Sequence, residues 1–274
     1  MEFSMKYGLV INGPDVIRGP LALLSGSFEE KLKKAKDLGF NGIELMVRDP
    51  AGLDWPRLKD SILSAGLEIP QVVTGELFGA DGLSLVNGDP ALRERSQERV
   101  KTVIDLAAYL NAMINMGRLR GRLDSINEPK DAWSLAHEYL HPIFKYALEK
   151  GVKITFEPLN RYESDFINTA ADAIRFIDES GFMNIGVMLD TFHMNIEEKS
   201  FEDGLRTAGD KLWHVHIADS NRKYPGSGHI DFTSFFGTLK EMGYQKYISA
   251  ELLPLPDPDT AATKTIEFLK EYVH

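Results

Sequence analysis

The sequence contains no cysteine. The chain can therefore form neither disulfides nor thiolate zinc sites, and it cannot use a cysteine as a nucleophile. Uninterrupted apolar runs are also short, and none approaches the roughly 20 residues that a membrane-spanning helix requires. The segment MEFSMKYGLVINGPDV at the start lacks the apolar stretch of a secretory signal. Together these absences predict a soluble, cytoplasmic protein without a membrane partner.

Positive charge is in the minority. The 31 Lys and Arg residues stand against 41 Asp and Glu residues, which gives a formal net charge of -10. An acidic surface repels phosphate backbones, so nucleic acid is not an expected partner. The basic residues gather closely at one place, GRLRGR at 117–122.

Short β-like runs alternate with amphipathic helical stretches along the chain. The expected strands are residues 7–11, 42–47, 69–74, 112–116, 153–156, 185–189, 212–218 and 247–250. The expected helices are residues 28–38, 55–65, 91–110, 128–150, 169–180, 201–208, 232–242 and 259–272. No Pro/Gly/Ser-rich linker interrupts them, and no GxGxxG follows the first strand, which disfavours a doubly wound open sheet. The alternation predicts an α/β fold, a single (β/α)₈ TIM barrel over residues 1–274.

Acidic residues follow several of the expected strands. The segments DLGFNGIEL (37–45), EKGVKITFE (149–157) and EMGYQKYISAE (241–251) each carry a glycine, a strand and then an acid. Parallel barrel strands end at one mouth, where active sites of this fold lie. The last four strands bring Glu157, Asp190, a histidine of WHVHIAD and Glu251 to that mouth. Within HVH, His216 is nearer the mouth, whereas His214 is expected one layer deeper as a hydrogen-bonded core residue.

Three carboxylates at one opening repel one another, and a divalent cation resolves that conflict. Two Glu, one Asp and one His form a hard donor set suited to Mn²⁺, Mg²⁺ or Co²⁺. Singly, each acid is more simply explained as a helix N-cap or a solvated residue. Their coincidence on four successive strands favours a metal site. Glu44, which ends the second strand, either supports this site or caps a helix.

Five segments carry a resemblance to known proteins: FEPLNRYE (156–163), LDTFHMNIEE (189–198), HVHIADSNR (214–222), PGSGHIDF (225–232) and AELLP (250–254). Together they resemble the D-tagatose 3-epimerase family of sugar isomerases and epimerases, which have the xylose isomerase-like barrel. VRDP (47–50), DGLSL (81–85) and RGR (120–122) narrow the resemblance to 5-keto-L-gluconate epimerases. The resemblance implies one divalent ion, usually Mn²⁺, Co²⁺ or Mg²⁺ and here expected to be Mn²⁺. Its implied ligands are Glu157, Asp190, His216 and Glu251.

The resemblance also implies contacts between substrate hydroxyls and Glu163, His193 and Arg222. His193 is expected in a loop after the sixth strand, and Arg161 is expected to brace the carboxylates. The ketose epimerases have a Trp-Pro-type segment where this chain has MGRLRG, so their sugar preference is not expected to carry over unchanged.

An acidic sugar requires a cation in this acidic site. Arg120, after the fourth strand, is the expected partner of a substrate carboxylate, because a guanidinium binds a carboxylate through two hydrogen bonds. Arg118 is the second candidate.

The predicted function is epimerisation of a keto sugar or keto-uronate of the 5-keto-L-gluconate or D-tagaturonate type. A proton leaves the carbon next to the ketone to form a metal-stabilised enediolate, and a proton returns on the opposite face. Glu157 and Glu251, from opposite sides of the mouth, are predicted to be the two bases. The expected assembly is a homodimer or homotetramer, and the expected partner is a small sugar or sugar acid.

Other activities fit the same residues. An aldose–ketose isomerase such as hydroxypyruvate isomerase, a ketohexose 3-epimerase or an inosose-type dehydratase would use the same ion and bases. A DNA-repair endonuclease on the related barrel needs further metal ligands and a basic groove, which seven histidines and a charge of -10 disfavour. A non-catalytic sugar-binding barrel would not need the complete ligand set.

Overall fold

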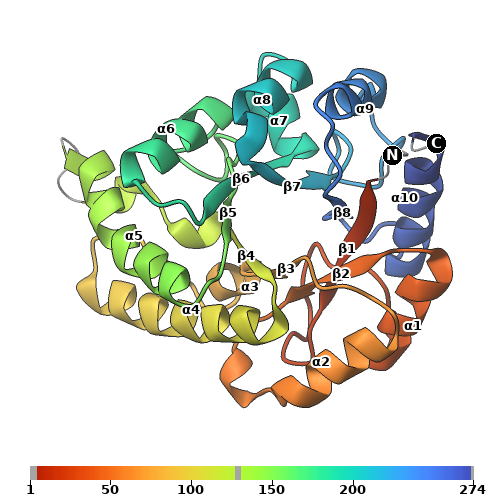
Figure 1. Ribbon diagram of the computed structural model, residues 1–274, viewed down its shortest axis with the longest axis horizontal. Coiled ribbons are helices and arrows are strands. Elements are labelled where there is room, and N and C mark those ends of the chain that lie inside the picture. Colours follow the sequence, from red (N-terminus) through yellow and green to blue (C-terminus); the bar gives the residue numbers. More distant parts are fainter. Residues whose placement is uncertain (1–4, 127–130, 273–274) are drawn as a thin grey trace.

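Eight parallel strands form a closed barrel in which each strand pairs with its neighbours in chain order, and β8 pairs with β1. The computed structural model describes residues 5–126 and 131–272. The strands are β1 (Lys6–Asn12), β2 (Gly42–Met46), β3 (Gln71–Val73), β4 (Met113–Met116), β5 (Ile154–Phe156), β6 (Ile185–Asp190), β7 (Leu212–Ile217) and β8 (Tyr247–Ala250). Figure 1 shows them in the middle of the molecule with the helices as an outer ring. The predicted (β/α)₈ fold is confirmed.

Helices connect the strands and cover the outside of the barrel. The longer ones are α1 (Phe28–Leu38), α2 (Trp55–Ser64), α4 (Pro90–Leu110), α5 (Ala132–Glu149), α6 (Ala170–Ser180), α8 (Phe201–Ala208), α9 (Phe232–Glu241) and α10 (Pro258–Tyr272). Shorter elements are α3 (Gly75–Gly79), α7 (Thr191–Glu197) and the 3₁₀ turns η1 (Pro50–Gly52), η2 (Arg118–Arg120), η3 (Leu123–Ser125) and η5 (Gly209–Lys211).

Helix α1 illustrates how the sequence sets these boundaries. A reciprocal capping box between Ser27 and Glu30 starts it, and Gly39 ends it in the left-handed conformation at φ 97°. Its apolar side buries Leu32 and Ala35 against the barrel. A glycine directly after a helical stretch also predicted the ends of several other helices from the sequence.

The barrel has an apolar exterior and a partly polar interior. Every residue of β2 and of β6 is buried, as expected for parallel strands that are covered on both faces. The polar side chains of Glu44, Gln71, Thr155 and His214 are fully buried within the barrel strands. A buried polar layer of this kind is stable only when its members hydrogen-bond to one another.

The structure departs from the sequence predictions at a few elements. Residues 191–197 were predicted to be a loop but form α7, because the Asp190 side chain caps that helix by accepting from the Phe192 amide. Helix α3 was not predicted. Helix α5 begins at Ala132, and residues 128–130 of the predicted helix lie outside the described residues.

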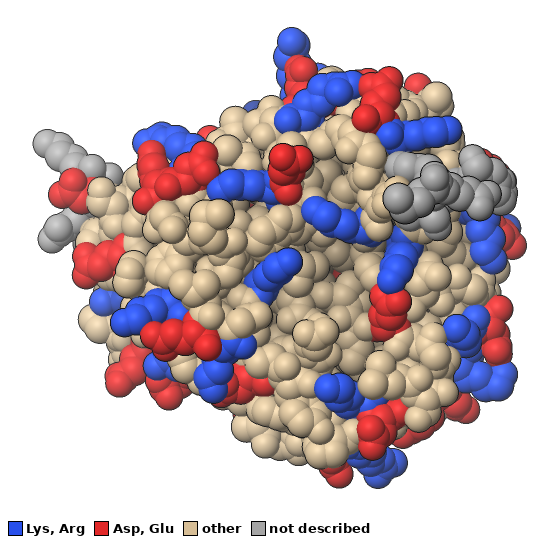
Figure 2. All heavy atoms as spheres, viewed as in Figure 1, with Lys and Arg blue, Asp and Glu red and all other residues tan. Residues whose placement is uncertain are grey.

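The surface carries charges of both signs. Figure 2 shows Lys and Arg interspersed with Asp and Glu around the rim of the face that it presents. Within residues 5–126 and 131–272, none of the helices has the length and apolar character that a membrane span requires.

Candidate active site

Four successive strands bring together the four predicted metal ligands. Glu157 follows β5, Asp190 ends β6, His216 lies in β7 and Glu251 follows β8. One donor atom from each residue lies within 4.8 Å of the other three. Nδ1 of His216 is 3.5 Å from Oε2 of Glu251 and 4.0 Å from Oε1 of Glu157. The cluster therefore converges at the carboxyl ends of the strands, where the sequence placed it.

Three atoms of this cluster are buried without a hydrogen-bond partner: Oε1 of Glu157, Oδ2 of Asp190 and Nδ1 of His216. A buried polar atom without a partner costs about 1–3 kcal/mol, so three that face one another indicate a missing shared partner. Carboxylate oxygens and an imidazole nitrogen are donors that Mn²⁺, Mg²⁺ and Co²⁺ accept. The residues present therefore fit a divalent cation.

The carboxylates of this cluster differ in pKa. Burial, reinforced by the charge of Glu251, raises the pKa of Glu157 to about 8. Burial also raises the pKa of Asp190, although the charge of Arg222 partly opposes it. For Glu251, burial is outweighed by His216 and Arg222, which together lower the pKa. The neighbouring positive charges thus do not suffice to keep all three carboxylates ionised at neutral pH. A divalent cation would supply the additional positive charge that their ionisation requires.

Binding of Mn²⁺ is expected to release protons at pH 7, because coordination requires the ionised carboxylate of Glu157 and a free lone pair on Nδ1 of His216. The pKa of Glu157 is about 8, and although burial opposes it, the carboxylates of Glu44 and Glu251 raise the pKa of His216 well above its usual range. The affinity for Mn²⁺ should therefore rise with pH through neutrality. Isothermal titration calorimetry in two buffers of different ionisation enthalpy measures the release. An observed enthalpy that is the same in both buffers would contradict this expectation.

Arg222 closes one side of the cluster. Its Nη2 donates to Oε2 of Glu251 at 2.6 Å, and its Nη1 lies 2.8 Å from Oδ2 of Asp190 as an ion pair that is not aligned for a hydrogen bond. The guanidinium also lies 4.8 Å from the centre of the Phe192 ring. The structure thus places this predicted substrate contact beside two of the predicted ligands.

Asp219 shapes the loop that carries Arg222, and the sequence analysis did not identify it. Its carboxylate is buried and accepts from the amides of Ser220, Gly226 and Ile230 at 2.7, 2.8 and 3.2 Å. These bonds fold residues 219–230 tightly enough for Arg222 to adopt φ 60°. The sequence signal was present, since an aspartate ahead of the Gly/Ser-rich PGSG segment is typical of such side chain–backbone turns.

His193 lies in the first turn of α7 and is almost completely buried. Its Nδ1 accepts from the amide of Asn160 at 3.3 Å, and a backbone amide can only donate. Burial, followed by the charge of Arg222, holds the pKa of His193 well below its usual range. The ring is therefore neutral. Its Nε2 lies 3.9 Å from Oε1 of Glu157 and 3.3 Å from Nη1 of Arg222, a guanidinium nitrogen that can only donate, so both ring nitrogens face donors.

Asn160 links two predicted substrate contacts that do not touch each other. Its side-chain amide donates to Oε1 of Glu163 at 3.0 Å and lies 2.8 Å from Nδ1 of His193. Glu163 is partly exposed and His193 is buried, so Asn160 connects the rim of the mouth to its interior. Arg161, by contrast, is exposed and pairs with Glu197 at 2.9 Å, so the expectation that it braces the carboxylates is wrong.

Arg120 does not line the mouth, contrary to the sequence prediction. Its side chain is fully buried, and Nη1 donates to the carbonyls of Gly117 and Glu157 at 3.0 and 2.8 Å. Nη2 donates to the Ser164 hydroxyl and to two more carbonyls, those of Phe166 and Ile167. The guanidinium of Arg120 thus stabilises the loop after β5 by donating to its backbone carbonyls. Both of its Nη atoms are already hydrogen-bonded, so neither is free to bind a substrate carboxylate.

Gly117 packs directly against Glu157, a constraint that sequence reasoning missed. A Cβ atom built at Gly117 would lie 2.6 Å from Oε2 of Glu157. A larger residue at this position would push the carboxylate out of the cluster. A glycine immediately after a strand is the signal for such a close approach.

Glu44 lies beneath the cluster and does not cap a helix. Its carboxylate bonds to Nε2 of His214 at 2.6 Å and to Nε2 of His216 at 3.0 Å. Burial opposes ionisation, but the two imidazoles outweigh it and hold the pKa of Glu44 well below its usual range. His214 is the buried, hydrogen-bonded core residue that the HVH spacing predicted.

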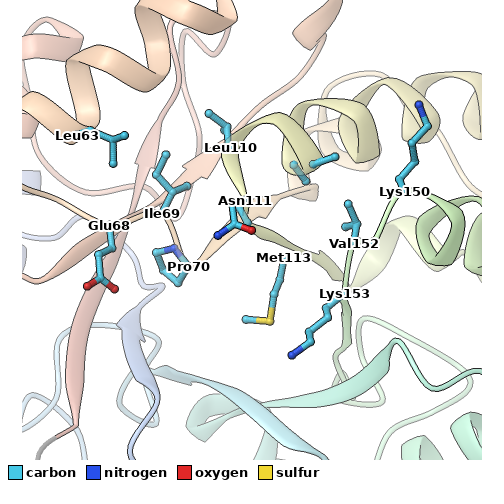
Figure 3. Close-up of a pocket in the computed structure, with 14 residues that line it drawn as sticks. Leu63, Glu68, Ile69, Pro70, Leu110, Asn111, Met113, Lys150, Val152 and Lys153 are labelled. Atoms are coloured by element: carbon cyan, nitrogen blue, oxygen red, sulfur yellow. The ribbon is translucent and has the colours of Figure 1, made fainter.

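The hollow in Figure 3 lies at the opposite end of the barrel from the cluster. It measures about 600 Å³ and is lined by residues that precede β3, β4 and β5, among them Glu68, Asn111 and Lys153. Two of its charged groups are paired: Glu68 with Lys6 at 2.7 Å and Lys150 with Asp105 at 2.6 Å. This hollow is therefore separate from the candidate active site.

Comparisons with known proteins find relatives with the same barrel fold. The profile of the xylose isomerase-like TIM barrel family matches residues 32–272. The L-ribulose 3-epimerase of Mesorhizobium japonicum is 34% identical over 81% of this chain and 74% of its own. The 3-dehydro-D-guloside 4-epimerase of Escherichia coli is 30% identical over 88% of this chain and 93% of its own. A solved L-ribulose 3-epimerase superposes with a TM-score of 0.82 at 28% identity, covering 97% of this chain and 94% of that one.

Proposed function

The chain belongs to the xylose isomerase-like TIM barrel family, and we propose that it is a divalent-metal-dependent epimerase of a keto sugar or keto-uronate. The observation that carries the proposal is the convergence of Glu157, Asp190, His216 and Glu251 within 4.8 Å. The names of its relatives, which are epimerases acting at carbon 3 or carbon 4 of sugars, support the same reaction class.

A divalent cation held by these four residues, with Mn²⁺ as our first choice and Mg²⁺ or Co²⁺ as alternatives, would stabilise the negative charge that develops on the substrate oxygens. Inversion then requires one group that removes a proton and another that returns one on the opposite face. Glu157 and Glu251 follow β5 and β8, which are three positions apart in the closed barrel, so their carboxylates approach the mouth from different sides. We assign them as the two bases.

The surrounding residues orient these bases and the substrate. Arg222 fixes the Glu251 carboxylate through its 2.6 Å bond, while Gly117 leaves room for Glu157. Nε2 of His193 lies beside Glu157 and Nη1 of Arg222, where a substrate oxygen can contact both side chains. Glu163, at the rim, can accept from a substrate hydroxyl through the oxygen that Asn160 does not use. The mouth thus offers polar contacts on the side of β5 and a fixed base on the side of β8.

A metal-reconstituted assay across keto-uronates and neutral ketohexoses tests the proposed function. Product identification by NMR distinguishes epimerisation from the 1,2 proton shift of an aldose–ketose isomerase and from the loss of water by a dehydratase. Saturable sugar binding without any product would instead support the sugar-binding barrel. The narrower resemblance to 5-keto-L-gluconate epimerases and the homo-oligomeric state stay predictions.

We expect Arg118 to recognise a substrate carboxylate now that Arg120 is excluded by its burial. Arg118 opens η2 at the end of β4, is partly exposed and lies 5.4 Å from the centre of the Phe78 ring. Its charge also contributes to lowering the pKa of His193, after burial, Arg222, Arg120 and His216, so its guanidinium lies within electrostatic reach of the site.

The variant Arg118→Gln should lose about tenfold or more in kcat/KM for a keto-uronate and little for a ketohexose, since a charged hydrogen bond contributes about 1.5–3 kcal/mol. The matched control is Arg122→Gln, because Arg122 is also partly exposed and pairs with Asp124 at 2.7 Å. Equal losses for both substrates would contradict a carboxylate contact.

A further inference from the structure

The buried polar residues beneath the cluster include one, Glu44, that can orient the proposed metal ligand His216. We propose that Glu44 is a positioning residue that selects the tautomer of His216, so that its Nδ1 carries a free lone pair toward the other three ligands. The proposal rests on the proposed metal site, but its central claim concerns the protein's own hydrogen atoms. It can therefore be tested separately from the reaction.

The first step is the bond between Glu44 and His216. An ionised carboxylate accepts hydrogen bonds and cannot donate them, so the His216 nitrogen 3.0 Å from Oε2 of Glu44 carries the ring proton. That nitrogen is Nε2. The other ring nitrogen, Nδ1, is buried without a hydrogen-bond partner and faces Glu251 at 3.5 Å. Glu44 thus determines which nitrogen is free to coordinate.

The second step is that Gln71 favours the opposite tautomer. Because the Glu44 carboxylate only accepts, the Gln71 atom 2.6 Å from its Oε2 must be the amide nitrogen. The amide oxygen of Gln71 correspondingly accepts from the Thr155 hydroxyl at 2.9 Å. The same Gln71 nitrogen lies 3.3 Å from Nε2 of His216. Without Glu44, this N–H group would donate to Nε2 and leave the ring proton on Nδ1.

Glu44 and Gln71 therefore compete for one imidazole, and Glu44 prevails because its charged hydrogen bond is the stronger. Loss of Glu44 does more than remove a favourable contact, because it also allows the ring proton of His216 to move to Nδ1, the coordinating nitrogen. If Glu44 only packed against His216, its loss would not move that proton. Residues that orient a metal-bound histidine typically change metal affinity by about 10–100-fold when replaced.

Glu44, His214 and His216 also satisfy the distance criterion for a second metal site. Gln71 argues against it, because its amide N–H points at Oε2 of Glu44 from 2.6 Å, where a cation would be repelled. The two interpretations differ in stoichiometry: one ion per chain for a positioning role, and two if Glu44 is itself a ligand.

Calorimetric titration with Mn²⁺ tests the proposal on the purified, metal-free protein. The variant Glu44→Leu should bind Mn²⁺ at least about tenfold more weakly than the wild type. Gln71→Leu alone should bind within about threefold of the wild type, because Glu44 still holds His216. The double variant Glu44→Leu/Gln71→Leu should recover part of the affinity, because the competing donor is gone.

Several outcomes would overturn the proposal. Glu44→Leu binding Mn²⁺ within about threefold of the wild type would do so, as would a double variant no better than Glu44→Leu. Two ions per wild-type chain, with one lost in Glu44→Leu, would make Glu44 a ligand. A wild type that binds no divalent ion would instead refute the proposed function and leave the tautomer to be decided by the NMR measurement.

Burial would lower the pKa of His216, but the carboxylates of Glu44 and Glu251 raise it well above its usual range in the metal-free protein. Imidazole ¹⁵N shifts recorded above that pKa, where the ring is neutral, report the tautomer directly, which a merely structural role would not change. His216 should be protonated on Nε2 in the wild type and on Nδ1 in Glu44→Leu. If Glu44→Leu does not fold, Glu44→Gln decides. Its amide oxygen should face Gln71 and His216 and keep the proton on Nε2. A neutral His216 ring that carries its proton on Nδ1 in the wild type would overturn the proposal.

Discussion

Replacing either Glu157 or Glu251 by glutamine is expected to lower kcat by about a hundredfold to ten-thousandfold, which is the usual contribution of a positioned general base. An amide keeps an oxygen that can approach a cation, but it cannot accept or deliver a proton at neutral pH. Each variant removes the proton transfer on one face of the substrate. Epimerisation needs both faces, so either change should abolish most of the turnover.

Solvent-deuterium exchange separates this mechanism from simple loss of metal. With Mn²⁺ bound, each variant should exchange the reacting hydrogen of only one of the two epimers, the one whose proton faces the remaining carboxylate. Glu198→Gln is the matched control, because Glu198 is a partly buried glutamate that accepts from the Ala170 amide outside the site. Near wild-type turnover in both metal-loaded variants would disprove the two-base assignment.

Removal of divalent ions is expected to abolish activity and to lower the melting temperature by about 5 °C or more. An ion present at about 100 times its Kd contributes about 2.7 kcal/mol of stability, and each 1 kcal/mol shifts the melting temperature of a large domain by roughly 2–4 °C. Part of this stability comes from satisfying the three buried atoms of Glu157, Asp190 and His216 that have no hydrogen-bond partner.

Differential scanning calorimetry after dialysis against EDTA, followed by addition of Mn²⁺, Co²⁺ or Mg²⁺, measures the shift and the recovery together with the activity. Asp190→Asn is the control whose melting temperature should rise less than that of the wild type at the same ion concentration, since it weakens the ligand set without removing the cap on α7. Full activity in protein shown by elemental analysis to be free of metal would contradict the proposed role of the ion.

Residues that follow a strand were predictable because a strand has only one direction. Once Glu157, Asp190 and Glu251 were assigned to the carboxyl ends of parallel strands, the fold required them to meet at one mouth. Alternation along β7 put His214 and His216 on the same side, and the choice of His216 followed from its place nearer the carboxyl end of the strand. Asp190 shows that two interpretations of one residue can both hold, since one oxygen caps α7 while the other faces the cluster.

Side chains in loops were less predictable, because several partners compete for a long flexible group and only packing decides among them. Arg120 was expected at the mouth but is buried and donates to backbone carbonyls such as those of Glu157 and Phe166. The nearby Arg118 is partly exposed. Arg161 pairs with Glu197 because α7, which was not predicted, presents that carboxylate.

The sequence by itself determined the barrel and the four residues at its mouth. Both follow from local periodicity and from the direction of parallel strands, which neighbouring residues specify. Only the tertiary structure decided the contacts between residues distant in sequence. Glu44 meets His216 across 172 positions and Asn160 meets His193 across 33, and no local pattern specifies such pairs. The reason is physical: a hydrogen bond in a barrel interior depends on strand register and burial, which exist only once the whole sheet has closed.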